Sequence, residues 1–284
     1  MGLKEIIQCK LDCNQARELV IRAGHKAGAG HIGGSLSAIE ILRACLATMK
    51  FDFHAPESEE NDWLVLSKGH CCVGWYAMLA QQKHITVEEL LTFEDLGSRL
   101  QGHIDRGLFY PFARISSGSL GQGLSAGIGM RLSMIRKNLQ GRVVVILGDG
   151  ECQSGMVLEA MMYAGFHKVV GLAAIIDNNK LQLVGETDAI LSIEPIREAC
   201  ESFGWQTTEV DGHDMEQVVN ALKKGLKNRE QPVLIVAHTM KGRGISFMEG
   251  NFRWHHRAPN DQEKERAIEE LQQARQKLMT EVNR

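Results

Sequence analysis

The chain has 284 residues, a formal net charge of −3 at pH 7 and 44% hydrophobic residues. This apolar content is enough for one large domain, or for a domain with an extension. A nearly neutral charge gives no electrostatic reason to expect a nucleic acid or an anionic membrane as a partner. The N-terminus lacks the apolar stretch of a signal peptide, and no window approaches the length of apolar sequence that spans a bilayer. We therefore expect a cytoplasmic protein that does not enter the membrane.

The sequence contains seven cysteines, an odd number, and no pair of them has the spacing of zinc ligands. This pattern predicts reduced thiols, several of them buried, in a cytoplasmic protein. The cysteines are Cys9, Cys13, Cys45, Cys71, Cys72, Cys152 and Cys200.

Amphipathic patterns predict helices along the first half of the chain. Apolar residues spaced at i, i+3, i+4 and i+7 start at Ala16 and end near Gly28, which is typical of a helix and its C-terminal cap. A second stripe follows Ser35 and includes Ala38, Leu42, Cys45 and Met49, and a third helix is expected over residues 123–139.

Four short apolar runs predict buried parallel strands, because each is bounded by Gly, Asp, Asn or a charged residue. These runs lie at residues 63–66, 143–147, 169–176 and 233–237. Their alternation with helix-length segments predicts an α/β fold, with a mostly parallel sheet and helices on both faces.

The C-terminal segment, residues 260–284, has a different composition from the rest. Ala267, Leu271, Ala274 and Leu278 form a narrow apolar seam among charged and polar residues. The seam predicts a helical extension that packs either on its own domain or on another subunit, and the sequence leaves both possibilities open. We therefore divide the chain into one domain at residues 1–259 and an extension at residues 260–284.

Two of the predicted strands lead into short polar motifs. The run at 143–147 continues directly into GDG at residues 148–150, and the run at 169–176 precedes NN at residues 178–179, about 27 residues further on. Parallel strands present their carboxyl ends at one edge of the sheet, where open α/β sheets bind ligands. The two motifs are therefore expected to lie together at that edge.

These motifs supply oxygen ligands of the kind that Mg²⁺ prefers. The Asp149 carboxylate and the Asn179 amide oxygen would bind the ion, and the backbone carbonyl of Leu181 can supply a third protein oxygen. Phosphate oxygens and water would complete the coordination, and the glycines allow backbone N–H groups to approach a diphosphate. This spacing of GDG and NN resembles the thiamine diphosphate motif.

Eight segments together resemble the transketolase family. They are GHIGGSLSAIEIL, LVLSKGH, GHIDRG, SSGSLGQGLSAGIGM, GDGECQSG, IIDNNKLQL, TMKGRGISFME and WHHRAP. They occur in the family order and span nearly the whole chain, which corresponds to the N-terminal half of a full-length transketolase. The resemblance implies the thiamine diphosphate-binding fold, in its diphosphate-binding (PP-type) form.

The resemblance also implies roles for individual residues. His31, His103 and His255 would line the substrate channel and hydrogen-bond the sugar. Asp149, Asn179 and the Leu181 carbonyl would hold Mg²⁺, with Ca²⁺ or Mn²⁺ as substitutes. The cofactor would be bound by His70, Gly118, Ser119, Leu120, Asp149, Gly150, Asn179, Leu181 and His255.

Three further residues, His256, Lys68 and Lys241, can be interpreted in more than one way. The WH-x-x-AP frame favours His255 over the adjacent His256 as the family histidine. Lys68 and Lys241 could contact phosphate, or they could be solvated lysines or lysines that brace a loop, and the sequence leaves these alternatives open.

In the transketolase family, a glutamate that activates the cofactor and aromatic residues that stack on its pyrimidine ring belong to the following domain. This sequence ends before such a domain. The resemblance therefore implies a partner, the C-terminal (pyrimidine-binding) transketolase subunit, most plausibly in an α2β2 assembly.

The implied reaction transfers a two-carbon ketol unit (glycolaldehyde) from a ketose phosphate to an aldose acceptor, as in the pentose phosphate reactions of carbohydrate metabolism. The cofactor supplies the bond-breaking chemistry, and the protein binds and orients the sugar phosphates. The donor and acceptor sugars stay open at this point.

Two alternatives are an alpha subunit of a thiamine diphosphate-dependent 2-oxo-acid dehydrogenase and a non-catalytic regulatory thiamine-binding subunit. The histidine-bearing segments GHIGGS and SKGH argue against the dehydrogenase. Ser154 stands where the family usually carries a glutamate at the subunit interface, which supports the regulatory alternative and puts communication between cofactor sites in question.

Overall fold

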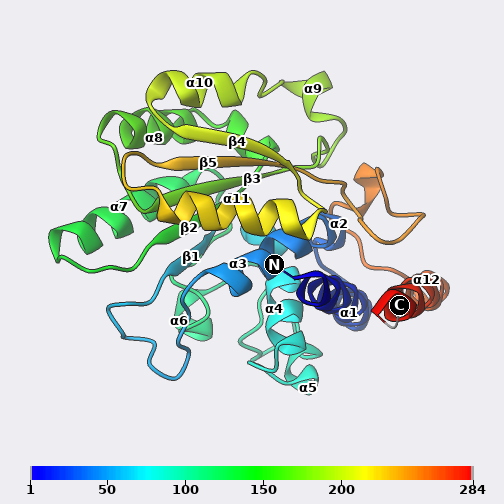
Figure 1. The fold of residues 1–284 in the computed structure, drawn as a ribbon. Helices are drawn as coiled ribbons and strands as arrows, with labels where there is room; N and C mark the ends of the chain where they lie inside the picture. The colour runs from blue at the N-terminus through cyan, green and yellow to red at the C-terminus, as the bar shows by residue number, and fades with distance from the viewer. Residues whose placement is uncertain (1, 283–284) are drawn as a thin grey trace.

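The structure is a computed structural model that describes residues 2–282. Its centre is a five-stranded sheet in which every pairing is parallel and the strand order is β1-β2-β3-β5-β4 (Figure 1). The strands are β1 (Trp63–Leu66), β2 (Val143–Gly148), β3 (Leu172–Asn178), β4 (Gln206–Asp211) and β5 (Val233–His238).

Helices cover both faces of this sheet, as predicted for an α/β fold. The α-helices are α1 (Leu3–Ala27), α2 (Ile32–Ser37), α3 (Ile39–Thr48), α4 (Cys72–Gln81), α5 (Val87–Leu90), α6 (Arg106–Phe109), α7 (Gln122–Arg136), α8 (Gly155–Phe166), α9 (Thr187–Ile190), α10 (Ile196–Phe203), α11 (Met215–Lys227) and α12 (Asp261–Val282). Three short 3-10 helices complete the elements, η1 (Gly69–Cys71), η2 (Gly150–Gln153) and η3 (Phe252–Trp254).

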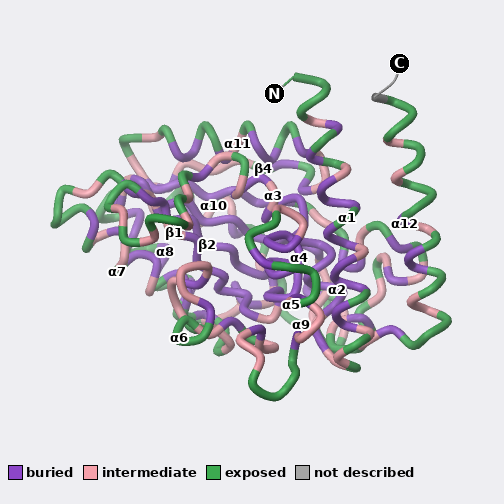
Figure 2. Tube along the Cα trace, turned by 90° about the horizontal axis from the view of Figure 1, so that it is seen from below, coloured by how far each residue is buried: buried purple, intermediate pink, exposed green. Residues whose placement is uncertain are grey.

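The core has two halves, because successive side chains along a strand point to opposite faces of the sheet. Val144 and Ile175 pack in one apolar cluster with residues of α1, α3, α4 and α11. Val145 and Ile176 pack in the other cluster with residues of α7, α8 and α10. Except for the edge strand β4, the strands are therefore buried on both sides, and Figure 2 shows buried backbone running through the interior of the molecule. This explains why they appear in the sequence as continuous apolar runs.

The predicted strands correspond to four of the five observed strands. The run at 63–66 coincides with β1, and those at 143–147 and 233–237 lie within β2 and β5. The run at 169–176 starts too early, because Gly171 has a left-handed backbone (φ 78°) and β3 begins only at the next residue. Strand β4 was not predicted.

The predicted helices also match observed ones. The stripe from Ala16 belongs to α1, which begins well before it at Leu3 and ends at Gly28 in the left-handed conformation (φ 65°). The stripe after Ser35 corresponds to α3, which Ala38 and Met49 flank as its caps, and the helix expected at 123–139 corresponds to α7.

The C-terminal extension is a helix, α12, that lies along α1 (Figure 1). The amide of Asn14 in α1 donates to the Leu271 carbonyl at 3.0 Å, and Arg275 forms an ion pair with Glu18 at 2.7 Å. Ala267 and Leu271 of the predicted seam are buried, whereas Ala274 is exposed. The extension thus packs on its own chain, while the division at residue 259 and docking on another subunit remain predictions. Residues 283 and 284 of the extension lie outside the described residues.

All seven cysteines are free thiols with buried side chains, as the sequence predicted for several of them. Within residues 2–282, no helix combines the length and apolar character needed to cross a bilayer.

The parallel sheet determines where functional side chains gather. Strands β1, β2, β3 and β5 all end at the same edge, and the chain continues from them into Ser67, Asp149, Asn179 and Thr239. Segments that are far apart in the sequence therefore meet beyond this edge, where open α/β sheets bind ligands.

Candidate functional site

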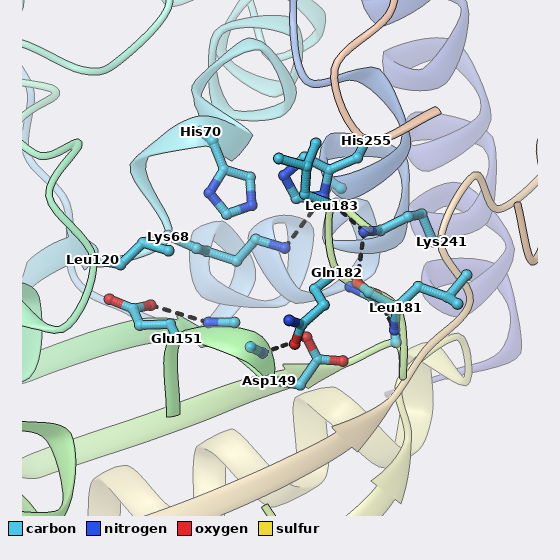
Figure 3. A pocket seen from close by; sticks show the side chains of 14 residues that line it. Lys68, His70, Leu120, Asp149, Glu151, Leu181, Gln182, Leu183, Lys241 and His255 are labelled. Carbon is cyan, nitrogen blue, oxygen red and sulfur yellow. Dashed lines mark hydrogen bonds between the residues drawn. The ribbon is translucent and has the colours of Figure 1, made fainter. Parts of the chain in front are cut away.

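A pocket lies at the carboxyl edge of the sheet, between the segments that follow β1, β2, β3 and β5 (Figure 3). It contains seven of the residues predicted from the sequence: His70, Leu120, Asp149, Gly150, Asn179, Leu181 and His255. The remaining lining residues are Gly34, Lys68, Gly148, Glu151, Gln182, Leu183 and Lys241. The structure thus brings together the GDG motif, the NN motif and two of the predicted histidines.

Asp149 and Asn179 are held in place by the backbone that surrounds them. The Asp149 carboxylate accepts hydrogen bonds from the N–H of Gly150 at 2.7 Å and from the N–H of Lys180 at 2.6 Å. The Asn179 side-chain oxygen accepts the N–H of Leu181 at 3.1 Å. These bonds fold the segment after β3 against the end of β2, so the two predicted ligands are neighbours at the sheet edge.

The chemistry of this pair fits a divalent cation. Asp149 is only 3% exposed, and burial, together with the neighbouring carboxylate of Asp177, raises its pKa. A cation would relieve this unfavourable environment by compensating the buried charge. Within the described residues there is no cluster of three or more His, Cys, Asp or Glu side chains that could hold a metal. The predicted set has only one carboxylate, so it depends on phosphate oxygens and water, as Mg²⁺ sites commonly do.

The third predicted ligand, the Leu181 carbonyl, already has a partner. It accepts a hydrogen bond from Lys241 Nζ at 2.6 Å. A carbonyl oxygen has two lone pairs, so this contact leaves one acceptor direction for a cation.

Lys68 is buried in the pocket wall, where it forms an ion pair with Asp177. Its ammonium also donates to the Gly34 carbonyl at 3.1 Å. Burial alone would lower the pKa of Lys68, but the charge of Asp177 raises it above the ordinary value. Asp177 accepts further hydrogen bonds from the hydroxyls of Ser37 and Thr239. The pair therefore fixes the Lys68 ammonium beside the cavity and ties α2 to the ends of β3 and β5.

Lys241 is the second buried lysine, with 1% of its surface exposed. Besides the Leu181 carbonyl, its ammonium contacts His255 Nδ1 at 2.9 Å. Burial and the charge of Lys68 lower the pKa of Lys241 to about 8. From the sequence, each lysine could contact phosphate, be solvated or brace a loop. Because both side chains are buried, neither lysine is solvated.

The predicted histidines form one cluster beside the pocket, with His31 at its centre. The ring centroid of His31 lies 5.2 Å from that of His70 and 5.5 Å from those of His103 and His255. His256, which the sequence analysis set aside in favour of His255, is the nearest neighbour of His31, at 4.5 Å. Both members of the His-His pair therefore belong to the cluster.

The cluster favours uncharged imidazoles. Burial, followed by the neighbouring His256 and His103, lowers the pKa of His31 to about 4. Burial and the charge of Lys241 lower the pKa of His255 to about 3. Burial and the charge of Lys68 hold the pKa of His70 well below its ordinary value. At neutral pH these three rings are neutral, and each can donate one hydrogen bond and accept another.

Gly118, Ser119 and His103 lie beside the pocket without lining it. A Cβ added to Gly118 would be 3.4 Å from the His103 ring, so this glycine packs directly on the histidine. Leu120, the next residue but one, reaches the cavity and is 43% exposed. Leu183 on the opposite loop is 59% exposed. The pocket therefore has an exposed apolar rim.

Ser154 stands where the family resemblance implies a glutamate at the subunit interface, so its surroundings show whether another carboxylate takes that place. Ser154 is the residue before α8 and is partly exposed. Glu151 does not replace the missing carboxylate at the surface, because its side chain is buried and bonded to Ser67, Gly121 and Gly148. Gln153 hydrogen-bonds the Gln182 side chain at 2.9 Å.

Comparisons with known proteins place these features in context. Residues 9–278 match the family described as "Transketolase, thiamine diphosphate binding domain". The chain is 34% identical over 275 residues to one of the subunits of the apulose-4-phosphate transketolase of Phocaeicola vulgatus, covering 96% of this chain and 97% of that protein. It is 36% identical over 267 residues to the 6-deoxy-6-sulfo-D-fructose transketolase subunit SqwG of Clostridium sp., covering 94% and 97%.

Full-length relatives extend well beyond this chain. Mouse transketolase is 36% identical over 261 residues, which are 91% of this chain but 41% of the mouse protein. The crystal structure of transketolase from Campylobacter jejuni superposes with a TM-score of 0.84 at 25% identity and covers 96% of this chain and 43% of that one. The chain thus spans less than half the length of these two proteins but nearly the whole length of the two subunits above.

Proposed function

The chain belongs to the transketolase family, and we propose that it is the N-terminal, diphosphate-binding subunit of a two-subunit enzyme that transfers ketol units. One observation carries this proposal: Asp149, Asn179, two buried lysines and the predicted histidines gather at one pocket beyond the carboxyl edge of the sheet. The similarity to two transketolase subunits along nearly their whole length supports the two-subunit arrangement.

The pocket offers the groups needed to bind a diphosphate with its metal. Asp149, Asn179 and the Leu181 carbonyl would hold Mg²⁺, or Ca²⁺ or Mn²⁺ in its place. His70, Gly150 and the backbone of residues 118–120 would contact the diphosphate of thiamine diphosphate, and Lys68 and Lys241 add positive charge beside it. When bound, thiamine diphosphate supplies the electron sink for cleaving and forming carbon–carbon bonds.

The histidines would orient the sugar and stabilise charge on its oxygens. Because His255 Nδ1 accepts a hydrogen bond from Lys241, its proton is on Nε2, and that N–H is available to a sugar oxygen or the cofactor. His31 and His103 would donate to sugar hydroxyls and to the carbonyl oxygen. Donors fixed before the reaction stabilise a developing alkoxide without reorganisation.

The exposed rim at Leu120 and Leu183 supports a partner that covers the pocket. We infer that this partner is a C-terminal transketolase subunit, which supplies the activating glutamate and the pyrimidine-binding surface, in an α2β2 assembly. The complex would act in the cytoplasm as a glycolaldehyde transferase. Its donor would be a ketose phosphate, or a related ketose with an anionic end group, as the names of the two subunit relatives suggest.

Co-purification followed by an activity panel tests this function. The chain is isolated from its source with any stoichiometric partner, and the complex is assayed with thiamine diphosphate, Mg²⁺, a set of ketose phosphates and a set of 2-oxo acids. We expect ketol transfer from a ketose phosphate by the complex and none by the chain alone. Decarboxylation of 2-oxo acids without ketol transfer, or full transfer by the isolated chain, would contradict the proposal.

A further inference from the structure

Glu151 is a buried carboxylate that the proposed function does not use. It follows the GDG motif and is 2% exposed. Its Oε1 accepts hydrogen bonds from the Ser67 hydroxyl and, at 2.8 Å, from the N–H of Gly121. Its Oε2 accepts the N–H of Gly148 at 3.1 Å. One side chain, which lies in the pocket wall (Figure 3), therefore binds three donors that come from three separate segments of the chain.

These three segments carry most of the groups assigned to the cofactor diphosphate. Ser67 begins the segment that contains His70, after β1. Gly121 closes the segment that contains Gly118, Ser119 and Leu120, before α7. Gly148, the last residue of β2, begins the GDG motif. Glu151 is thus placed where the three diphosphate-binding segments converge.

The segments also touch through their backbones. A Cβ on Gly123 would lie 2.7 Å from Ser67 Cα, and a Cβ on Gly69 would lie 3.0 Å from the Gly118 nitrogen. A side chain at Gly123 would therefore collide with the Ser67 backbone, and one at Gly69 would be pressed against the Gly118 backbone. The N–H of Gly123 donates to the Ser67 hydroxyl oxygen at 3.1 Å, which extends the Glu151 network to the first turn of α7.

We propose that Glu151 is a positioning residue that fixes the three segments in the arrangement required to bind the cofactor diphosphate. This inference rests on the proposed function. It requires a carboxylate, because every partner of Glu151 is a donor and a carboxylate offers only acceptors. A glutamine has one acceptor oxygen, so its NH₂ group would face Gly148 or the pair of Ser67 and Gly121, and would leave buried N–H groups without a partner.

The test uses the complex with its co-purified partner and the variants Glu151→Gln, Ser67→Ala and the double variant. Glu230→Gln is the matched control, since it makes the same chemical change at an exposed residue just before β5, at the opposite end of the sheet. The dissociation constant of thiamine diphosphate at saturating Mg²⁺, kcat at saturating cofactor, and Tm are measured for each.

We expect Glu151→Gln to raise the cofactor dissociation constant about tenfold or more, as for loss of a hydrogen bond to a charged group. Its kcat at saturating cofactor should stay within about threefold of the unsubstituted complex, because residues acting through binding change affinity before turnover. Ser67→Ala should act in the same direction, and the effects of the two changes should not add, because both act on one network.

A dissociation constant for Glu151→Gln equal to that of Glu230→Gln would overturn the inference while leaving the proposed function intact. Additive effects of the Ser67 and Glu151 substitutions would also overturn it. If Glu151→Gln does not fold, Ser67→Ala decides, and unchanged affinity in that folded variant counts against the inference. Failure of the unsubstituted complex to bind the cofactor would contradict the proposed function itself.

Discussion

Lys241 Nζ lies 2.9 Å from His255 Nδ1, so a buried ammonium fixes the tautomer of a neighbouring histidine. An ammonium has only donors, which means that Nδ1 must accept and the imidazole proton must be on Nε2. The same ammonium contacts the Leu181 carbonyl. Lys241 therefore connects the segment proposed to hold the metal with the histidine cluster proposed to contact the sugar.

Replacing Lys241 by methionine should break the connection between the proposed metal-binding segment and the histidine cluster. We expect kcat to fall by about 10²-fold, since a wrongly oriented or wrongly protonated histidine loses much of its catalytic effect. The pKa of His255 should rise, because the charge of Lys241 lowers it in the folded protein. Steady-state kinetics and NMR titration of the His255 ring measure the two effects.

Lys223→Met, on the exposed side of α11, is the control for this substitution and should change neither quantity. A Lys241→Met complex with normal kcat and an unshifted His255 titration would show that the contact has no role in the site.

His103 is predicted to act on the sugar and not on the cofactor. It packs on Gly118 and His31 but does not line the pocket that holds Asp149. His103→Ala should lower kcat by about 10²–10³-fold, the order of effect expected for a lost donor to a developing negative charge, and leave the cofactor dissociation constant nearly unchanged. The exposed His54, changed to alanine, serves as the control. Unaltered turnover would remove His103 from the site.

The buried pair of Lys68 and Asp177 should be sensitive to the loss of one partner. Asp177→Asn leaves the Lys68 charge buried without compensation, and we expect the free energy of unfolding to fall by about 3–5 kcal/mol. Adding Lys68→Met should recover part of this loss, because the uncompensated charge is then removed. Urea denaturation measures both. A loss below about 1 kcal/mol for Asp177→Asn would show that water or other groups already compensate the charge.

The histidine cluster predicts a loss of stability in mild acid. His31 and His255 have pKa values of about 4 and about 3 in the folded protein, below the ordinary value of about 6.5 in the unfolded chain. Between these values the unfolded state binds more protons, so the stabilisation is complete above pH 6.5 and is lost as the pH falls toward 4 and then 3. Each such histidine adds at most about 1.4 kcal/mol per pH unit to the slope.

This slope is measured by denaturant unfolding of the cofactor-free protein between pH 4 and 7. His255→Asn should reduce the slope, because Asn can accept the Lys241 hydrogen bond but does not titrate. His54→Asn, at an exposed position, should leave it as it is. A stability that does not change between pH 6.5 and 4 would contradict the neutral state of the cluster.

The central strands were predictable because they are buried on both faces and appear as uninterrupted apolar runs. Strand β4 was not, since it lies at the edge of the sheet and consists mostly of partly buried or exposed polar residues, such as Thr208, Glu209 and Asp211. Its strand state depends on pairing with β5 and not on its own composition.

The part of the site formed by motifs that directly follow strands could be predicted from the sequence. The side chains that are buried by residues distant in the sequence were harder to predict. GDG and NN follow strands, so their meeting at one edge follows from a parallel sheet. The buried state of Lys241 depends on Leu181 and His255, and that of Glu151 on Ser67 and Gly121, none of which a local pattern indicates. His256 was set aside because the WH-x-x-AP frame favours His255, and that frame carries no information on the contact between the His256 and His31 rings.

The central claim is that Asp149 and Asn179 seat a cation that carries a diphosphate. Calorimetry of the complex with thiamine diphosphate, with and without Mg²⁺, tests it most directly, with Asp149→Asn measured in parallel. We expect saturable, Mg²⁺-dependent binding that EDTA reverses, weakened about tenfold or more by Asp149→Asn through loss of a charged ligand. Binding of equal strength without Mg²⁺, or no binding by the complex, would contradict the account.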